Sequence, residues 1–132
     1  MSESRLALEQ TNLIQRFDLQ VAQAGQSVDQ EFEVEAGASR ILGILLTSDR
    51  EDLMFYRGSQ EIRVSNQELC PEGYESKLLM SGLNVPPHER FHEADFSTGN
   101  RQVDVKYQDT DHPRATFTPY RVSLYLFMET DD

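Results

Sequence analysis

Apolar and polar residues alternate with a period of two along much of this sequence, which is the pattern of half-buried β-strands. The alternation occurs in four segments separated by turn residues: 17–21, 28–36, 102–108 and 120–128. In the second segment the polar positions include Glu31, Glu33 and Glu35, which predicts a strand with an acidic outer face. Residues 41–46 are apolar at nearly every position, and therefore predict a central strand that is buried on both faces.

The other segments are less regular. Residues 53–57 and 60–65 are two further strand candidates, and Arg57-Gly58-Ser59 between them is typical of a β-hairpin turn. Residues 66–76 and 81–101 are polar and interrupted by proline and glycine, so they predict loops. The second of these loops is long, and long loops in compact domains often carry function.

Seven or eight strand candidates with regular turns and no strong internal helix predict an all-β fold. The arrangement we expect is a single-domain antiparallel β-sandwich, jelly-roll-like, over residues 13–132. Residues 1–12 predict an N-terminal arm or a short helix, because the apolar residues at the start of the chain can share one helix face: Leu6, Leu13, Ile14 and Phe17. The chain has 132 residues, of which 38% are hydrophobic, and this suits one domain with one core.

Charge and cysteine content exclude several classes of protein. The net charge is −11 and the sequence pI is about 4.6, so the surface repels nucleic acid, and we predict no nucleic-acid partner. No apolar run approaches the length that crosses a bilayer, so no direct membrane insertion is expected. The start, Met1-Ser-Glu-Ser-Arg5, lacks the features of a secretory signal, which predicts cytoplasmic synthesis without a signal peptide. Cys70 is the only cysteine, so no internal disulfide can form.

One motif has the pattern of a catalytic site. His88-Glu89-Arg90-Phe91-His92 matches H-E-x-x-H and, over these five residues, resembles the zinc metalloproteases. On a helix, histidines four positions apart share a face and can bind one zinc ion, while the glutamate acts as general base; His112 is a candidate third ligand. The family carries this motif on a long helix, whereas a helix here would have barely two turns and a charged Arg90 between the ligands. We therefore predict no metal, cofactor or catalytic residue, with His88, His92 and His112 solvated or bonded to nearby carboxylates.

Two segments are candidate interfaces. The last strand carries large apolar side chains on both faces, with Tyr125 and Phe127 opposite the main stripe. Either a second layer of the same chain or another subunit must cover these two side chains. The 81–101 loop presents Val85, Arg90 and Phe91, and either contacts a partner or folds back over one end of the sandwich.

Three functions are compatible with these observations. The first is a non-enzymatic structural or assembly subunit that binds copies of itself and other assembly proteins. In size, strand count and terminal arm the chain resembles the small jelly-roll proteins that build or decorate phage and viral capsids, and this resemblance implies a place in a virion. The second is a loop-based protein- or carbohydrate-binding module, for which Tyr56, Tyr74 and Tyr107 would form the sugar platform because tryptophan is absent. The third is a zinc-dependent hydrolase that uses the His88–His92 motif.

Overall fold

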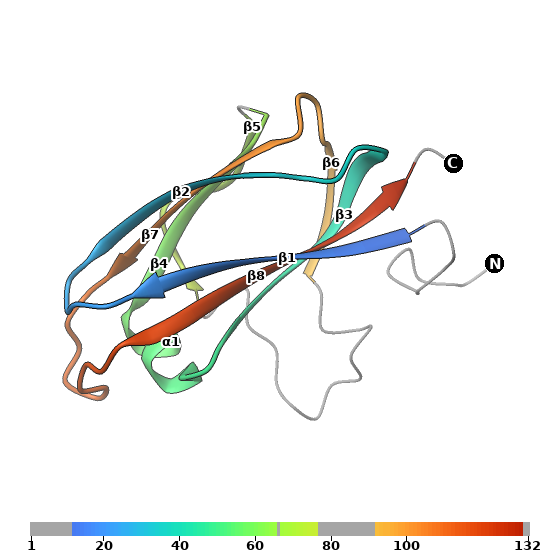
Figure 1. The fold of residues 1–132 in the computed structure, drawn as a ribbon. Helices are drawn as coiled ribbons and strands as arrows, with labels where there is room; N and C mark the ends of the chain where they lie inside the picture. The colour runs from blue at the N-terminus through green and yellow to red at the C-terminus, as the bar shows by residue number, and fades with distance from the viewer. Residues whose placement is uncertain (1–11, 66, 77–91, 131–132) are drawn as a thin grey trace.

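The computed structural model describes residues 12–65, 67–76 and 92–130 (Figure 1). These residues form one short helix and eight strands, so the described chain is mostly β-structure, in agreement with the predicted all-β class. In chain order the elements are β1 (Asn12–Val21), β2 (Ser27–Glu33), β3 (Ala38–Ser48), α1 (Glu51–Arg57), β4 (Gly58–Val64), β5 (Gln67–Glu75), β6 (His92–Ser97), β7 (Gln102–Asp109) and β8 (Tyr120–Thr130).

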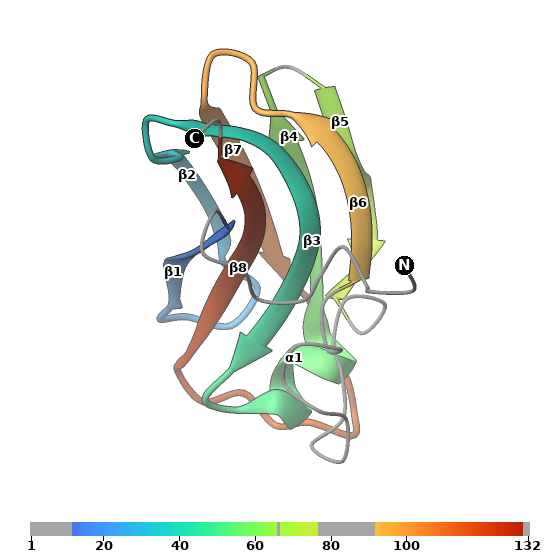
Figure 2. The ribbon, with the colours of Figure 1, turned by 90° about the vertical axis from the view of Figure 1, so that its right-hand side faces the viewer.

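The strands form two antiparallel sheets of four strands each. The first sheet has the order β1-β8-β3-β6, and the second has the order β2-β7-β4-β5. Figure 2 shows β8 and β3 of the first sheet in front of β7 and β4 of the second, and Figure 1 shows α1 at one end of the molecule. Neighbouring strands in the sheets are often far apart in the sequence, so most of the pairing is non-local.

Side chains of both sheets meet in one hydrophobic core. From the first sheet, Leu124 and Leu126 of β8 are fully buried, and from the second sheet Val103 and Val105 of β7 are 0% and 1% exposed. The alternation predicted for these two strands is confirmed, since the positions that were predicted to be apolar and buried in β7 and in β8 are buried in the structure. Residues 41–46 of β3 are all buried, as predicted for a central strand, and β3 lies between β8 and β6.

The predicted hairpin over residues 53–65 is wrong. Residues 53–57 belong to the helix α1, and β4 pairs instead with β5 and β7. The helix has acidic residues, Glu51 and Asp52, in its first turn and basic Arg57 in its last turn, which suits the helix dipole. A four-residue apolar run fits either a strand or a helical turn, so its local pattern did not distinguish the two.

Two predicted loops also contain strands. β5 occupies most of residues 66–76, and β6 lies at the end of the 81–101 region. Both are edge strands, and the pairing of β4 with β5 is irregular next to Pro71. Proline is tolerated at an edge because its missing N–H is not needed by a second neighbour. Proline and glycine therefore suggested loops where edge strands exist.

The arm or short helix expected over residues 1–12 stays a prediction. Leu13 and Ile14 lie in strand β1 and are not part of a helix; the residues before Asn12 lie outside the described part of the chain. Among the described residues, no helix is long and apolar enough to cross a membrane.

Candidate functional site

The backbone at His92 does not have the helical conformation that the zinc-site hypothesis requires. His92 is the first residue of strand β6, whereas the H-E-x-x-H chemistry needs both histidines on one helix. His88 to Phe91 lie outside the described residues. His112 lies in the connection between β7 and β8, where its Nδ1 accepts a hydrogen bond of 3.1 Å from the Arg114 N–H. Within the described ranges, no group of three His, Cys, Asp or Glu side chains is placed to hold a metal ion.

The two interface candidates on β8 have different environments. Phe127 is fully buried and packs with Leu42 in a small cluster separate from the main core, so this side chain is covered within the chain. Tyr125 is half-buried, and the Arg16 guanidinium lies 5.8 Å from its ring centre. The candidates Val85, Arg90 and Phe91 lie outside the described residues.

The outer face of the first sheet, which is the face turned away from the core, has an exposed row along β1. Ile14 is 40% exposed, and Arg16 and Asp18 follow it at alternate positions. Arg16 Nε donates to Asp18 Oδ1 at 2.8 Å, and Ser123 Oγ donates to the same carboxylate oxygen at 2.7 Å. The hydrogen bond from Arg16 lowers the pKa of Asp18, and burial opposes this shift only in part.

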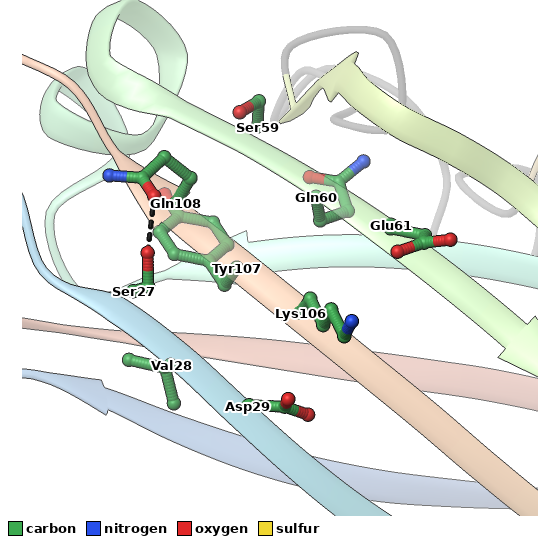
Figure 3. A pocket seen from close by; sticks show the side chains of 9 residues that line it. All are labelled: Ser27, Val28, Asp29, Ser59, Gln60, Glu61, Lys106, Tyr107 and Gln108. Atoms are coloured by element: carbon green, nitrogen blue, oxygen red, sulfur yellow. Dashed lines mark hydrogen bonds between the residues drawn. The ribbon is translucent and has the colours of Figure 1, made fainter.

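The outer face of the second sheet is polar and strongly charged. Shallow hollows cross it between β2, β7 and β4, and the one drawn in Figure 3 has a volume of about 180 Å³. Asp29, Lys106 and Glu61 stand side by side on the three strands, and Ser27 Oγ donates to the Gln108 side chain beside them. Carboxylates outnumber cations along these hollows, since Asp29, Glu31, Glu61 and Asp104 line one of them with only Arg63 and Lys106. Tyr107, which borders the hollow in Figure 3, is only 1% exposed.

A closed polar cluster lies at the end of the molecule that holds α1. The side chains of Arg57 and Asp109 are both 0% exposed and form two hydrogen bonds, from Nε to Oδ1 at 3.0 Å and from Nη2 to Oδ2 at 2.9 Å. Tyr120 Oη donates to Asp109 Oδ1 at 2.7 Å, and the Gly25 N–H donates to Oδ2 at 2.8 Å. Arg57 Nη1 also donates to the Ala115 carbonyl at 2.8 Å. Every oxygen of the buried carboxylate is therefore hydrogen-bonded.

The protonation of this cluster follows from its surroundings. Burial would raise the pKa of Asp109, but the hydrogen bonds from Arg57, the Gly25 N–H and Tyr120 outweigh it and lower the pKa below its usual value. Burial raises the pKa of Tyr107 to about 12, although its hydrogen bond with Tyr120 partly offsets the shift. Asp109 is therefore charged and Tyr107 neutral at physiological pH, and neither is available as an acid or base near neutrality.

Packing around the cluster is close. A Cβ atom at Gly58 would meet the Tyr107 hydroxyl and would lie 2.9 Å from the Met54 carbonyl oxygen. Ser76 Oγ donates to Gln60 Oε1, while Gln60 Nε2 has no hydrogen-bond partner among the described residues. Nothing in the local sequence marks Arg57 and Asp109 as a pair, since an arginine after an apolar run and an aspartate ending an alternating strand are common surface patterns.

One end of the molecule exposes aromatic side chains. Phe55 and Tyr56 of α1 are 43% and 37% exposed, and their rings meet edge to face at 5.0 Å. The His112 ring lies 5.0 Å from the ring of Tyr56. Of the three tyrosines considered as a sugar platform, Tyr56 is exposed and Tyr107 is 1% exposed, which removes Tyr107 from that role.

Comparison of the chain with protein-family models, with curated proteins and with solved structures found no significant match.

Proposed function

We propose that this chain is a non-enzymatic structural subunit that associates with copies of itself and with other assembly proteins. The arrangement that we propose for its two sheets is a jelly-roll sandwich, in which successive strands cross repeatedly from one sheet to the other. The strand orders β1-β8-β3-β6 and β2-β7-β4-β5 are those expected of such a crossing pattern, and this is the observation on which the proposal mainly rests.

Side chains fill the space between the two sheets, and this supports a function that depends on the outer surface of the molecule. Jelly rolls include metal- or ligand-holding domains as well as capsid subunits. Aliphatic side chains such as Ile62, Val64 and Leu124 occupy the space where an internal ligand would lie. The two buried charged side chains, Arg57 and Asp109, bind each other, and further hydrogen bonds join them to the Ala115 carbonyl, the Gly25 N–H and Tyr120. A phage or viral particle is the setting that we propose for such a subunit.

Light scattering across a concentration series tests this proposal. We expect the weight-average mass to rise from that of one 15.2 kDa chain to a defined multiple as the concentration increases. The same expectation holds in the presence of a metal chelator, since the proposed association uses no metal. A mass that stays at one chain up to the solubility limit would contradict a self-assembling subunit.

The exposed aromatic pair on α1 favours a second candidate, a protein- or carbohydrate-binding module. Phe55 and Tyr56 lie on α1, with the His112 ring next to Tyr56, and aromatic rings suit both sugar faces and protein partners. A glycan array probed with the purified chain and with Tyr56→Ala distinguishes the sugar branch. Binding that is lost in Tyr56→Ala would support it, and an array without bound glycans would remove it.

A further inference from the structure

β1 is one edge of the first sheet. All ten of its residues pair with β8, and no other strand in the described part of the chain pairs with it (Figure 2). An edge strand directs alternate N–H and C=O groups away from its sheet, and these groups can pair with a strand of another molecule. A ten-residue edge is long for such a strand, and it offers several of these groups in one row.

The exposed side chains of β1 are complementary to themselves. Arg16 and Asp18 stand two positions apart on the outer face, on either side of Phe17, and each side chain is 42% exposed. If two copies of β1 run antiparallel with Phe17 at the centre, each Arg16 faces the partner's Asp18. The same register places Ile14, which is 40% exposed, opposite the partner's Gln20.

We propose that β1 pairs with β1 of a second copy about a two-fold axis at Phe17, which joins two first sheets into one continuous sheet. A two-fold contact uses the same patch on both subunits, so one register forms the Arg16–Asp18 contact twice. This inference rests on the proposed function, because it names the contact through which an assembly subunit binds its own kind.

The other edge strands suit this pairing less well. β2 carries Asp29, Glu31 and Glu33 at exposed positions, and like charges facing each other across an antiparallel pair are destabilising. β5 contains Pro71, which cannot donate to a ladder, and its pairing with β4 is irregular. β6 has only six residues. Of these edges, β1 is the longest, and the charges on its exposed face sum to zero.

Contacts within the chain hold β1 in place before any partner arrives. The Gln15 side chain bridges to the end of β2, because its Nε2 donates to the Glu33 carbonyl at 3.2 Å and its Oε1 accepts from the Glu35 N–H at 2.9 Å. A strand that is already ordered loses little conformational freedom when it pairs. Arg16 and Asp18 already bond to each other in one chain, so their exchange between chains sets the register more than the affinity.

Charge reversal with analytical ultracentrifugation tests the pairing. Arg16→Asp places like charges opposite each other twice in the dimer, and Asp18→Arg does the same with the opposite sign. We expect each single variant to raise the dissociation constant by about tenfold or more. The double variant Arg16→Asp with Asp18→Arg exchanges the two charges, keeps the complementarity, and is expected to return the dissociation constant close to that of the wild type.

The chain supplies a matched control for these variants. Arg50 and Asp52 form an ion pair with the same spacing at 46% and 54% exposure, and they lie at the start of α1 and not in β1. Arg50→Asp and Asp52→Arg are expected to leave the dissociation constant unchanged. Circular dichroism confirms that each variant keeps its strands.

The outcomes separate this inference from the proposed function. If the wild type associates and both single variants associate equally well, the contact lies on another edge or face; the pairing of β1 is then wrong and the proposed function stands. If the singles weaken association and the double variant does not restore it, the two-fold register at Phe17 is wrong. If the wild type remains a single chain throughout, both proposals are wrong.

Discussion

Arg57 and Asp109 are 52 positions apart in the sequence, and their side chains meet through two hydrogen bonds in a place where neither is exposed to solvent. The forked guanidinium matches the carboxylate, and such paired charge-assisted bonds are strong and directional. The contact joins the last residue of α1 to the last residue of β7. The Phe117 ring lies 5.3 Å from the Arg57 guanidinium carbon and covers the pair from the connection before β8.

Removing one partner of the Arg57–Asp109 pair should strongly lower the free energy of unfolding. Arg57→Met leaves the Asp109 carboxylate buried without its counter-charge, which typically costs about 3–5 kcal/mol of unfolding free energy. Urea titration followed by circular dichroism measures the loss. Arg50→Met, which breaks an exposed ion pair, serves as control and should change the free energy by about 0–1 kcal/mol. Similar small losses for both variants would show that the buried pair contributes no more than a surface pair.

The lowered pKa of Asp109 predicts a specific loss of stability in acid. The carboxyl ionises below its usual value of 3.8 in the folded chain, so its contribution is complete above pH 3.8 and is lost as the pH falls through the folded value. Asp109→Asn lacks this contribution at every pH. The difference in unfolding free energy between wild type and Asp109→Asn should therefore narrow as the pH falls below 3.8. A difference that stays constant into strong acid would contradict the assignment.

The raised pKa of Tyr107 predicts a loss of stability as the pH rises into the alkaline range. Its phenol ionises near pH 10 when unfolded, and burial raises the pKa to about 12 in the folded chain. Its contribution is therefore complete below pH 10 and is lost as the pH rises toward 12. Tyr107→Phe should lose less stability over this interval than the wild type, as measured by urea titration at each pH. Parallel losses in the two proteins would place the alkaline sensitivity elsewhere.

Gly58 should not tolerate a side chain, for a steric reason. Its φ of −98° is open to any residue, but a methyl group would meet the Tyr107 hydroxyl and the Met54 carbonyl. Overpacking of this kind costs about 1–3 kcal/mol, so Gly58→Ala should lower the denaturation midpoint. Adding Tyr107→Phe removes the hydroxyl and should recover part of the loss. If the double variant is no better than the sum of the two single changes, the clash with Tyr107 is not the cause.

Phe127 and Tyr125 should respond differently to truncation. Phe127→Ala empties a fully buried site and should cost about 3–5 kcal/mol, whereas Tyr125→Ala changes a half-buried ring and should cost less. Urea titration of the two variants measures both losses. A larger loss for Tyr125→Ala would mean that Tyr125, and not Phe127, is the better packed of the two aromatic residues.

The sequence alone predicted the strands that have one buried face. In β7, Val103, Val105 and Tyr107 are buried at alternate positions, and β8 follows its predicted stripe. This succeeded because side-chain direction alternates along any strand, so the burial of one face is encoded by neighbouring residues. The apolar run at residues 41–46 likewise predicted a central strand that is buried on both faces.

Tertiary structure alone decided which segments meet. The choice between helix and strand at residues 53–57, and the strand at β5, depended on distant neighbours that a local pattern does not contain. The candidate sites behaved in the same way. The sequence made Phe127 a candidate interface, whereas the structure buries it completely in a cluster with Leu42. Arg57 fitted a turn by its local sequence, whereas the fold places it against Asp109. A buried charge is costly unless its partner is buried beside it. The contact between Arg57 and Asp109 therefore depends on the fold, which places the end of α1 next to the end of β7.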